Sequence, residues 1–502
     1  MRYNSGPTSR KSLLTAFLLI AIFAGFALRF VDLGGKSLWA DEMHTIRQAL
    51  VNKEMGTKDI FENLQGPLVS VMMHFWAAVS TAESFLRFPF ALAGTLSVGA
   101  IFLLSKLLSG RWVALNTAFF ASLSPILIWY SQKIGGYAFV VLFSMLMTYY
   151  LVLWAASRKK LHLFLYGVFL LAGLLSNLSA AFVPVAHFIY LVAIPSKRRL
   201  VGAWLVTVLV VLLFFSPWVR NILPTTNADK VVGGETGRGI TAGGDFWMPA
   251  IPYFFFTYGV GYSLGPPGEA MEQSGIGTVT DRLPWVLFPL VVFAVPAAAG
   301  IRRLAGENSE LLFLLLLWLG IPILGVYALE QWNVGASGPG YALVSLVPYT
   351  LIVGRGLGAI TRSRWWFLTI VCAGLMGVSL WNYFVNPAYG NGSPAAARTI
   401  GENFMEGGTV VGLSEAEPLI QDLKDLAEVE TSEGSGVQSR DNVAARRPGI
   451  VESPERVWLS LCRESPAGPE GLVKRRFDNN TVPIRSLGFA RTSVLPYEKG
   501  DG

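Results

Sequence analysis

The chain has 502 residues, of which 52% are hydrophobic and 15% are charged, and its mean hydropathy is +0.48. This composition excludes an ordinary soluble domain and is typical of a protein with many transmembrane helices. The net charge of +7 does not indicate a nucleic-acid-binding protein, because the basic residues gather in short segments between apolar runs, where they orient a chain in the membrane.

Apolar runs follow one another along residues 1–385, where we expect an all-α polytopic membrane domain. About 11 of them approach the roughly 20 residues that a helix needs to cross a bilayer. The run from Pro67 to Val79 is shorter and is predicted to be a membrane-embedded helix that enters and leaves by the same face. The expected crossing helices are residues 12–30, 88–108, 112–130, 137–156, 161–176, 178–195, 201–219, 284–301, 311–329, 341–359 and 365–385.

The basic segments between these runs predict the orientation of the chain. They fall on one side of the membrane if the N-terminus is cytoplasmic, as the enrichment of Lys and Arg in cytoplasmic loops requires. The loops 31–87 and 220–284 and the whole C-terminal region are then extracytoplasmic, and chemistry is expected on that face. The segments are Arg10-Lys11, Arg158 to Lys160, Lys197 to Arg199, Arg302-Arg303, and Arg362 with Arg364.

Residues 386–502 are more polar and predict a small extracytoplasmic α/β domain. Short apolar runs at 409–413, 457–462 and 487–495 are expected to be strands, and 415–429 is expected to be a helix. The stretch 430–454, rich in Gly, Ser and charge, is predicted to be a mobile loop. The domain has the size to recognise an acceptor or to dock a protein partner.

Two adjacent carboxylates, Asp41 and Glu42, follow the first apolar run. A carboxylate at a membrane surface can have its pKa tuned by partial desolvation, as a general base acting on a hydroxyl requires. The alternative is that both residues open an amphipathic surface helix running to Leu50, where acidic side chains suit the helix dipole. The carboxylates by themselves leave both interpretations open.

Metal-binding and nucleotide-binding patterns are missing from the sequence. The histidines are scattered at 44, 74, 162 and 187, and Cys372 and Cys462 lie in different environments, so neither a zinc site nor a disulfide framework is expected. A Walker-type glycine loop is also missing, so a nucleotide-driven pump is not supported. A transporter is disfavoured too, because no charge is evident deep within the apolar runs.

The long segment from Arg220 to Pro284 is rich in glycine before Trp247 and Pro249. We expect either a flexible flap that closes over a bound lipid, followed by an interfacial helix with aromatic anchors, or a plain connector. Arg220 and Arg238 are cations that this segment offers to a phosphate.

Several short motifs, taken in order, resemble those of the GT-C glycosyltransferases that use polyprenyl-phosphate sugars, particularly the protein O-mannosyltransferase and aminoarabinose-transferase-like groups. The segment 34–42 resembles the first-loop "SLW-DE" element of these groups, and Gly66-Pro67-Leu68 resembles "HPPL". Residues 83–89 resemble the "R-P" start of the next helix, residues 124–138 resemble "SP-YSQEARxYA", and residues 339–348 resemble "PRY-P".

This resemblance implies a GT-C-like fold and an inverting transfer of a sugar from a polyprenyl-phosphate donor to a lipid, glycan or protein acceptor at the outer face of a bacterial plasma membrane. Asp41 would be the catalytic base, and Glu42 would help to hold the acceptor. Both carboxylates would be candidate ligands of a divalent cation, Mg²⁺ or Mn²⁺. The donor pocket would be lined by Gln65, Tyr130, Gln132, Lys133, Tyr137 and Tyr341.

The chain departs from these groups where they carry phosphate-binding arginines. Gly135 and Gly340 stand at the two expected Arg positions, and Lys133 is the nearest basic residue to the first of them. An ammonium supplies point charge but lacks the planar fork with which Arg binds a phosphate. Two functions therefore stay open: an active transferase with a rearranged donor site, and a degenerate subunit that serves as a scaffold or lipid-binding partner in an envelope glycan complex.

Overall fold

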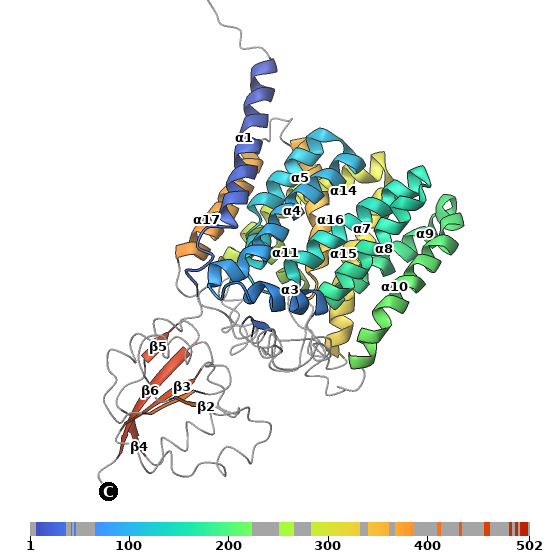
Figure 1. Cartoon of the computed structure of the whole chain (residues 1–502). Coiled ribbons are helices and arrows are strands. Elements are labelled where there is room, and N and C mark those ends of the chain that lie inside the picture. Colours follow the sequence, from blue (N-terminus) through green and yellow to red (C-terminus); the bar gives the residue numbers. More distant parts are fainter. Residues whose placement is uncertain are drawn as a thin grey trace, which may run out of the picture. The chain divides into compact units, whose positions relative to one another are not determined.

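The computed structural model describes residues 7–36, 42, 45–46, 66–222, 250–265, 283–331, 340–360 and 367–385, together with short strands between 409 and 499. The chain divides into two compact units (Figure 1). The first comprises Met1–Leu33 and Thr45–Asn382, and the second comprises Gly34–His44 and Tyr383–Gly502. The first unit is built of helices, and the strands all belong to the second.

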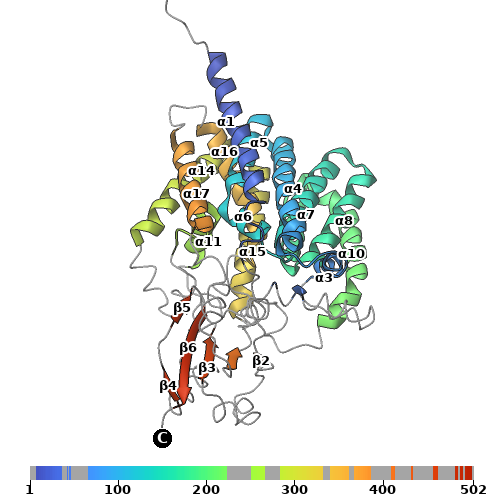
Figure 2. The ribbon, with the colours of Figure 1, turned by 60° about the vertical axis from the view of Figure 1, so that its left-hand side comes forward.

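The described helices follow the expected apolar runs closely, and most of them lie side by side in one bundle (Figures 1 and 2). In chain order they are α1 (Pro7–Leu28), α3 (Pro67–Ala77), α4 (Glu83–Ser109), α5 (Arg111–Leu123), α6 (Pro125–Ser131), α7 (Tyr137–Ser157), α8 (Lys160–Ser176), η2 (Leu178–Ala181), α9 (Phe182–Ala193), η3 (Pro195–Leu200), α10 (Val201–Ile222), α11 (Ala250–Val260), α14 (Leu283–Glu307), α15 (Ser309–Gln331), η6 (Leu343–Ser345), α16 (Leu346–Ile360) and α17 (Phe367–Val385).

The expected all-α polytopic membrane fold is confirmed. Within the described part of the chain, 7 helices are long and apolar enough to cross a membrane, or up to 8 if the bent pair α5–α6 is one span. Shorter apolar helices occur at Thr15–Leu28, Lys160–Ser176 and Leu178–Ala193, so a total of about 11 crossings stays a prediction. The helix α3 has only 11 residues, which is too short for a crossing, as expected.

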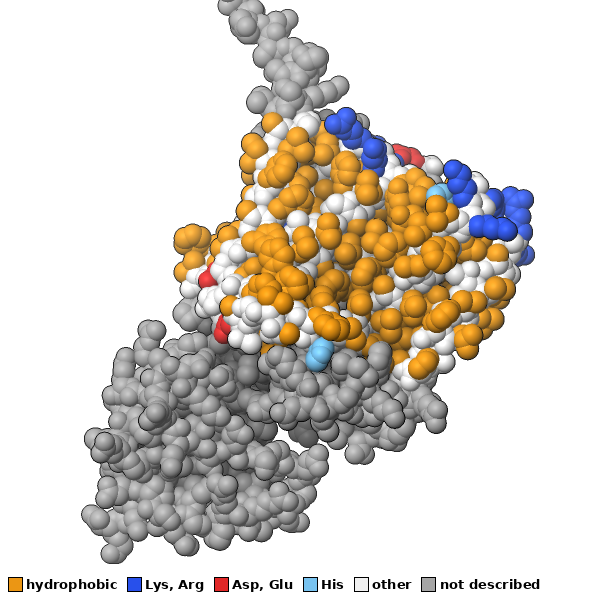
Figure 3. Space-filling view, viewed as in Figure 1, with side chains coloured by type: hydrophobic (Ala, Val, Ile, Leu, Met, Phe, Trp, Pro, Cys, Tyr) orange, Lys and Arg blue, Asp and Glu red, His pale blue; other side chains and the backbone are white. Residues whose placement is uncertain are grey.

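The outer surface of the helical unit is apolar, as a lipid-facing surface requires. Figure 3 shows hydrophobic side chains over most of the visible face and Lys and Arg along one edge of it. Large apolar side chains such as Leu213, Phe214 and Trp285 are about 70% exposed. Several exposed basic residues lie in or near the ends of helices: Lys106, Arg111, Arg158, Lys159, Lys160, Arg198, Arg199, Arg302 and Arg303.

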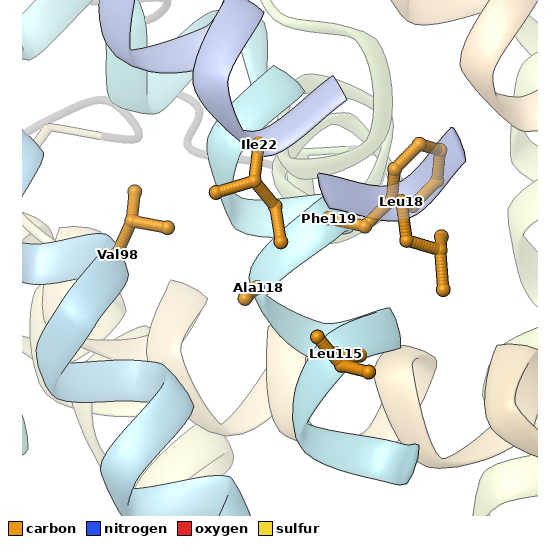
Figure 4. Packing of buried hydrophobic residues seen from close by; sticks show 6 residues of the cluster. All are labelled: Leu18, Ile22, Val98, Leu115, Ala118 and Phe119. Carbon is orange, nitrogen blue, oxygen red and sulfur yellow. The ribbon is translucent and has the colours of Figure 1, made fainter. Parts of the chain in front are cut away.

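The helix α1 packs closely on α5 and α4. Leu18 and Ile22 of α1 lie against buried side chains of these helices, among them Phe119 (Figure 4). Farther along α1, a Cβ atom at Gly25 would overlap the carbonyl of Ser122, so only glycine permits the close approach of α1 and α5 there. The end of α1 is therefore fixed against the end of α5.

The helices α14 and α16 touch through their backbones. A Cβ atom at Gly300 would overlap the carbonyl of Ile352, and a Cβ atom at Gly356 would overlap the carbonyl of Pro296. Small residues at helix contacts are a usual means of close packing in membranes.

The helix α11 corrects one expectation. An interfacial helix with aromatic anchors was one of the two alternatives for the glycine-rich segment, but Phe254, Phe256 and Tyr258 are buried in the first unit. The hydroxyl of Tyr258 lies 2.8 Å from the carbonyl of Ala342 and 2.6 Å from Oγ of Ser345. Protein, rather than the membrane interface, surrounds these aromatic side chains. The glycine-rich part of the segment, with Arg238, lies outside the described residues.

The second unit contains a mixed sheet of 6 strands in the order β2-β1-β3-β6-β4, with β5 paired to β6. The strand β1 is parallel to β2 and β3, whereas β6 is antiparallel to β3, β4 and β5. The strands are β1 (Thr409–Gly412), β2 (Thr431–Glu433), β3 (Arg456–Leu461), β4 (Thr481–Pro483), β5 (Leu487–Phe489) and β6 (Thr492–Lys499).

Two of the predictions for this unit were incomplete. The run 487–495 is not one strand but a hairpin, because Phe489 pairs with Thr492 and Leu487 pairs with Val494. The strand β2 lies inside the stretch that was predicted to be a loop. The predicted helix 415–429 lies outside the described residues.

Candidate functional site

The break between α5 and α6 shapes the region where the motifs meet. Pro125 has no N–H to donate to the carbonyl of Ala121, so the helix ends there and the two axes differ by 60°. The guanidinium of Arg29, at the end of α1, lies 3.1 Å from that carbonyl and 2.8 Å from the carbonyl of Ser122. Arg29 is fully buried. Because it donates to carbonyls that lack helical partners, it caps the end of α5 from a neighbouring helix.

Gln132, the C-cap residue of α6, reaches back to α1. Its Nε2 atom lies 3.2 Å from the carbonyl of Leu28, 3.4 Å from that of Arg29 and 2.7 Å from that of Val31. These carbonyls belong to the end of α1 and the turn after it, where helical partners are lacking. The side chain expected in the donor pocket thus binds backbone of the first helix.

Arg87 holds the other end of the same turn. Its Nη1 atom donates to the carbonyl of Leu33 at 2.9 Å and lies 3.6 Å from a carboxylate oxygen of Glu83. Arg87 is buried, and Glu83 is about one-third exposed. Glu83 and Arg87 therefore pair along α4, and the guanidinium of Arg87 also binds the turn.

Three tyrosines form a cluster beside the position of a missing arginine. The rings of Tyr130 and Tyr137 have centroids 4.6 Å apart, and the hydroxyl of Tyr130 lies 2.9 Å from that of Tyr262. A Cβ atom at Gly340 would overlap the Tyr130 hydroxyl and lie 3.5 Å from Cε1 of Tyr137. Tyr341 follows and is 8% exposed. The tyrosines occupy the space that a side chain at residue 340 would need.

Lys133 lies beside this cluster. Its side chain is only 6% exposed, and its Nζ atom is 5.9 Å from the centroid of the Tyr137 ring. Buried ammonium groups are costly unless they are balanced by electron-rich or anionic groups. The structure therefore brings together Tyr130, Lys133 and Tyr137, with Tyr341 next to Gly340.

Two motif segments also meet at the end of α8. A Cβ atom at Gly66 or at Gly136 would overlap the carbonyl of Ser176, and one at Gly136 would come within 3.2 Å of Cβ of Asn177. Gly66 has a φ of 115°, which side chains rarely adopt. The loop before α3, the turn before α7 and the end of α8 are thus in direct contact.

Of the two expected catalytic carboxylates, Glu42 is described and is fully buried, whereas Asp41 lies outside the described residues. Gln65, expected in the donor pocket, also lies outside them. In the described part of the chain, no group of three or more His, Cys, Asp or Glu side chains is placed to hold a metal ion.

The structure adds residues that the motifs did not indicate. Tyr262, just after α11, completes the tyrosine cluster, and Arg29 caps α5. One signal for Arg29 was present in the sequence, because a charge at the end of an apolar run is costly unless it has partners. Tyr262 gave no such signal.

Comparison with known proteins supports the expected family. The family model described as dolichyl-phosphate-mannose-protein mannosyltransferase matches residues 65–220. No curated protein matches the chain significantly.

Solved structures that resemble the chain include those of ArnT and of an oligosaccharyltransferase. ArnT from Cupriavidus metallidurans in the apo state has a TM-score of 0.56 and 12% identity, over 96% of this chain and 98% of that one. The same protein bound to undecaprenyl phosphate has a TM-score of 0.54 and 12% identity over the same shares. The Archaeoglobus fulgidus oligosaccharyltransferase in complex with Zn and sulfate has a TM-score of 0.46 and 14% identity, over 84% of this chain and 58% of that one. The expected resemblance to GT-C glycosyltransferases is confirmed, and the chain has the fold of ArnT.

Proposed function

We propose that this integral membrane protein is an inverting glycosyltransferase, which moves a sugar from a polyprenyl-phosphate carrier to a cell-envelope acceptor at the outer face of the membrane. The ArnT-like fold and the family match over residues 65–220 support a transferase. ArnT has been solved with undecaprenyl phosphate, which supports a donor of this class. The sugar, hexose or pentose, and the acceptor, lipid, glycan or protein, are to be identified by assay.

The observation that carries the proposal is the buried Lys133 beside Tyr130 and Tyr137. In the related motifs, arginines accompany this position, and here a buried ammonium and tyrosine hydroxyls are the available groups. A water-poor site with fixed donors stabilises a phosphate leaving group far more than water does. Lys133 supplies the positive charge, and the hydroxyls of Tyr130 and Tyr262 supply oriented dipoles.

The proposed reaction is a single displacement at the anomeric carbon. The acceptor oxygen forms a bond to this carbon as its proton passes to the carboxylate of Asp41, and the bond from the carbon to the phosphate oxygen breaks. The electron pair of that bond leaves with the polyprenyl phosphate, whose charge Lys133 balances. Glu42, which is fully buried, would orient the acceptor.

A degenerate, non-catalytic subunit is the second candidate. The observation that favours it is the position of the Tyr130 hydroxyl, which fills the space beside Gly340 where the related motifs have an arginine. Such a protein would bind the lipid carrier without transferring its sugar. It would then act as a scaffold, with residues 386–502 as a docking domain for protein partners.

Turnover and binding assays distinguish the two functions. The purified chain in lipid nanodiscs is supplied with a panel of polyprenyl-phosphate pentoses and hexoses, and turnover is compared with that of Asp41→Asn. Transfer that the substitution abolishes supports the enzyme. Donor binding without turnover of any donor and acceptor pair, unchanged in Asp41→Asn, supports the scaffold and overturns the enzyme.

The role of Lys133 is tested separately by donor affinity. We expect Lys133→Ala to weaken binding of undecaprenyl phosphate on the order of tenfold, because about 1.4 kcal/mol of ion pairing corresponds to that factor. Lys133→Arg should retain most of the affinity. The matched control is Lys106→Ala, which removes an exposed lysine from the far end of α4. Repeating turnover with EDTA, with and without added Mg²⁺ or Mn²⁺, tests for a divalent cation.

A further inference from the structure

The turn that follows α1 is held by side chains from two other helices. It comprises residues 29–33, and Asp32 within it has a φ of 58°, in the left-handed region that few residues other than glycine adopt. Asp32 is exposed, whereas Leu33 is buried. A turn with a strained residue keeps its shape only when its surroundings determine it. The chain leaves this turn directly into the loop that carries Asp41 and Glu42.

Gln132 fixes the start of the turn. Its side-chain amide has two N–H groups, and three carbonyls, those of Leu28, Arg29 and Val31, lie within 3.4 Å of Nε2. The turn thus engages both amide hydrogens, and none remains for a phosphate oxygen.

Arg87 fixes the end of the turn through the carbonyl of Leu33. One nitrogen of the Arg87 guanidinium donates to the carbonyl. The positive charge of the guanidinium is balanced by Glu83, which lies on the adjacent turn of α4. The turn is therefore anchored on α6 at one end and on α4 at the other.

We infer that Gln132 and Arg87 are positioning residues, which hold the turn 29–33, from which the chain continues into the segment that carries Asp41. This inference rests on the proposed function for its effect on catalysis. Gln132 is the residue immediately before Lys133, so one short segment anchors the base-bearing loop and supplies the proposed phosphate cation. In this role both residues act through the turn and not through the donor, whereas the motif resemblance assigns Gln132 to the donor pocket.

The inference is tested first by the mobility of the turn, which requires no catalytic activity. A spin label is attached at Val31→Cys, since the side chain of Val31 is 47% exposed, in a chain whose Cys462 is replaced by Ser and whose buried Cys372 is kept. We expect Gln132→Ala, Gln132→Glu and Arg87→Met each to raise the mobility of the label. Arg87→Lys retains a donor for the Leu33 carbonyl and should restore most of the order. The control Ser97→Ala removes a buried hydroxyl that bonds only within α4, at 2.9 Å from the Ala93 carbonyl, and should leave the label unchanged.

Kinetics then separate positioning from donor binding. We expect Gln132→Ala and Gln132→Glu to lower kcat on the order of tenfold to a hundredfold, as small misplacements of a reacting group do. The affinity for undecaprenyl phosphate should stay within about twofold of the wild type, because no phosphate contact is lost. A weakened affinity with an immobile label would make Gln132 a donor contact and overturn the inference. If the wild-type chain transfers no sugar, the proposed function fails, and the label mobility still decides whether the turn is held as inferred.

Discussion

Arg29, at the end of α1, caps α5, and Gln132, at the end of α6, binds carbonyls at the end of α1. The guanidinium of Arg29 donates to the carbonyls at the end of α5, and the amide of Gln132, at the end of α6, lies 3.4 Å from the carbonyl of Arg29 itself. The α5–α6 break and the end of α1 therefore stabilise each other. This reciprocal contact explains how a bent helix persists in a membrane, where unpaired carbonyls are costly.

Removing the Arg29 side chain should destabilise the protein through the carbonyls that it caps. We expect Arg29→Met to lower the free energy of unfolding by about 1–3 kcal/mol, the usual cost of leaving buried acceptors unpaired. The measurement is thermal unfolding in detergent, followed by intrinsic fluorescence. In a Pro125→Ala background, the new N–H can bond the Ala121 carbonyl, so the same substitution should cost less. Equal costs in the two backgrounds would contradict the capping role.

Restoring arginine at residue 340 should not restore a family-like site. Because a Cβ atom there overlaps the Tyr130 hydroxyl, Gly340→Arg should destabilise the fold by about 1–3 kcal/mol, as overpacking does. The double variant Gly340→Arg with Tyr130→Ala should recover part of this loss. Thermal unfolding and undecaprenyl phosphate affinity are measured on the three variants. A stable single variant with raised affinity would show that the tyrosine yields readily.

Two glycines of α4 provide a matched pair. A Cβ atom at Gly94 would overlap Oγ of Ser131, whereas nothing lies within 4 Å of one at Gly99, which is exposed. We expect Gly94→Ala to destabilise the protein by about 1–3 kcal/mol, and Gly99→Ala to be neutral or to stabilise it by up to about 1 kcal/mol through helix propensity. Similar melting temperatures for the two variants would contradict the close packing of α4 on α6.

The buried His187 on α9 should behave as one half of a polar pair. Its Nδ1 atom lies 3.3 Å from the hydroxyl of Tyr166, and its Nε2 atom lies 3.2 Å from Oγ1 of Thr148. His187→Leu and Tyr166→Phe should each cost about 1–3 kcal/mol, since each leaves a buried partner unpaired. The double variant should cost less than the sum by roughly 1 kcal/mol. Additive unfolding free energies would mean that the two side chains do not interact.

The helices of the first unit could be predicted from the sequence because apolar length is a local property. The burial of α11 could not, since Phe254 and Phe256 look the same in the sequence whether lipid or protein surrounds them. The hairpin of β5 and β6 was missed for a related reason, because apolar residues occur in both of its strands.

The site was predicted in part. The motifs indicated Tyr130, Lys133 and Tyr137 as neighbours, and the structure brings them together. The spacing of residues along the chain does not specify where a side-chain amide points. The contact of Gln132 with the end of α1 could therefore not be predicted. Tyr262 joins the cluster from a segment far away in sequence, which is information that only the tertiary fold contains. Asp41 remains a prediction from the motif.

The backbone contact between α14 and α16 limits how this protein can move. With Gly300 and Gly356 seated against carbonyls of the opposite helix, neither helix can rotate or slide without first separating from the other. The two helices should therefore travel as one rigid body in any opening that admits an isoprenoid chain. An opening of this kind would form elsewhere, and the span Pro195–Trp218, which includes most of α10, is the least buried of the long spans that the structure describes.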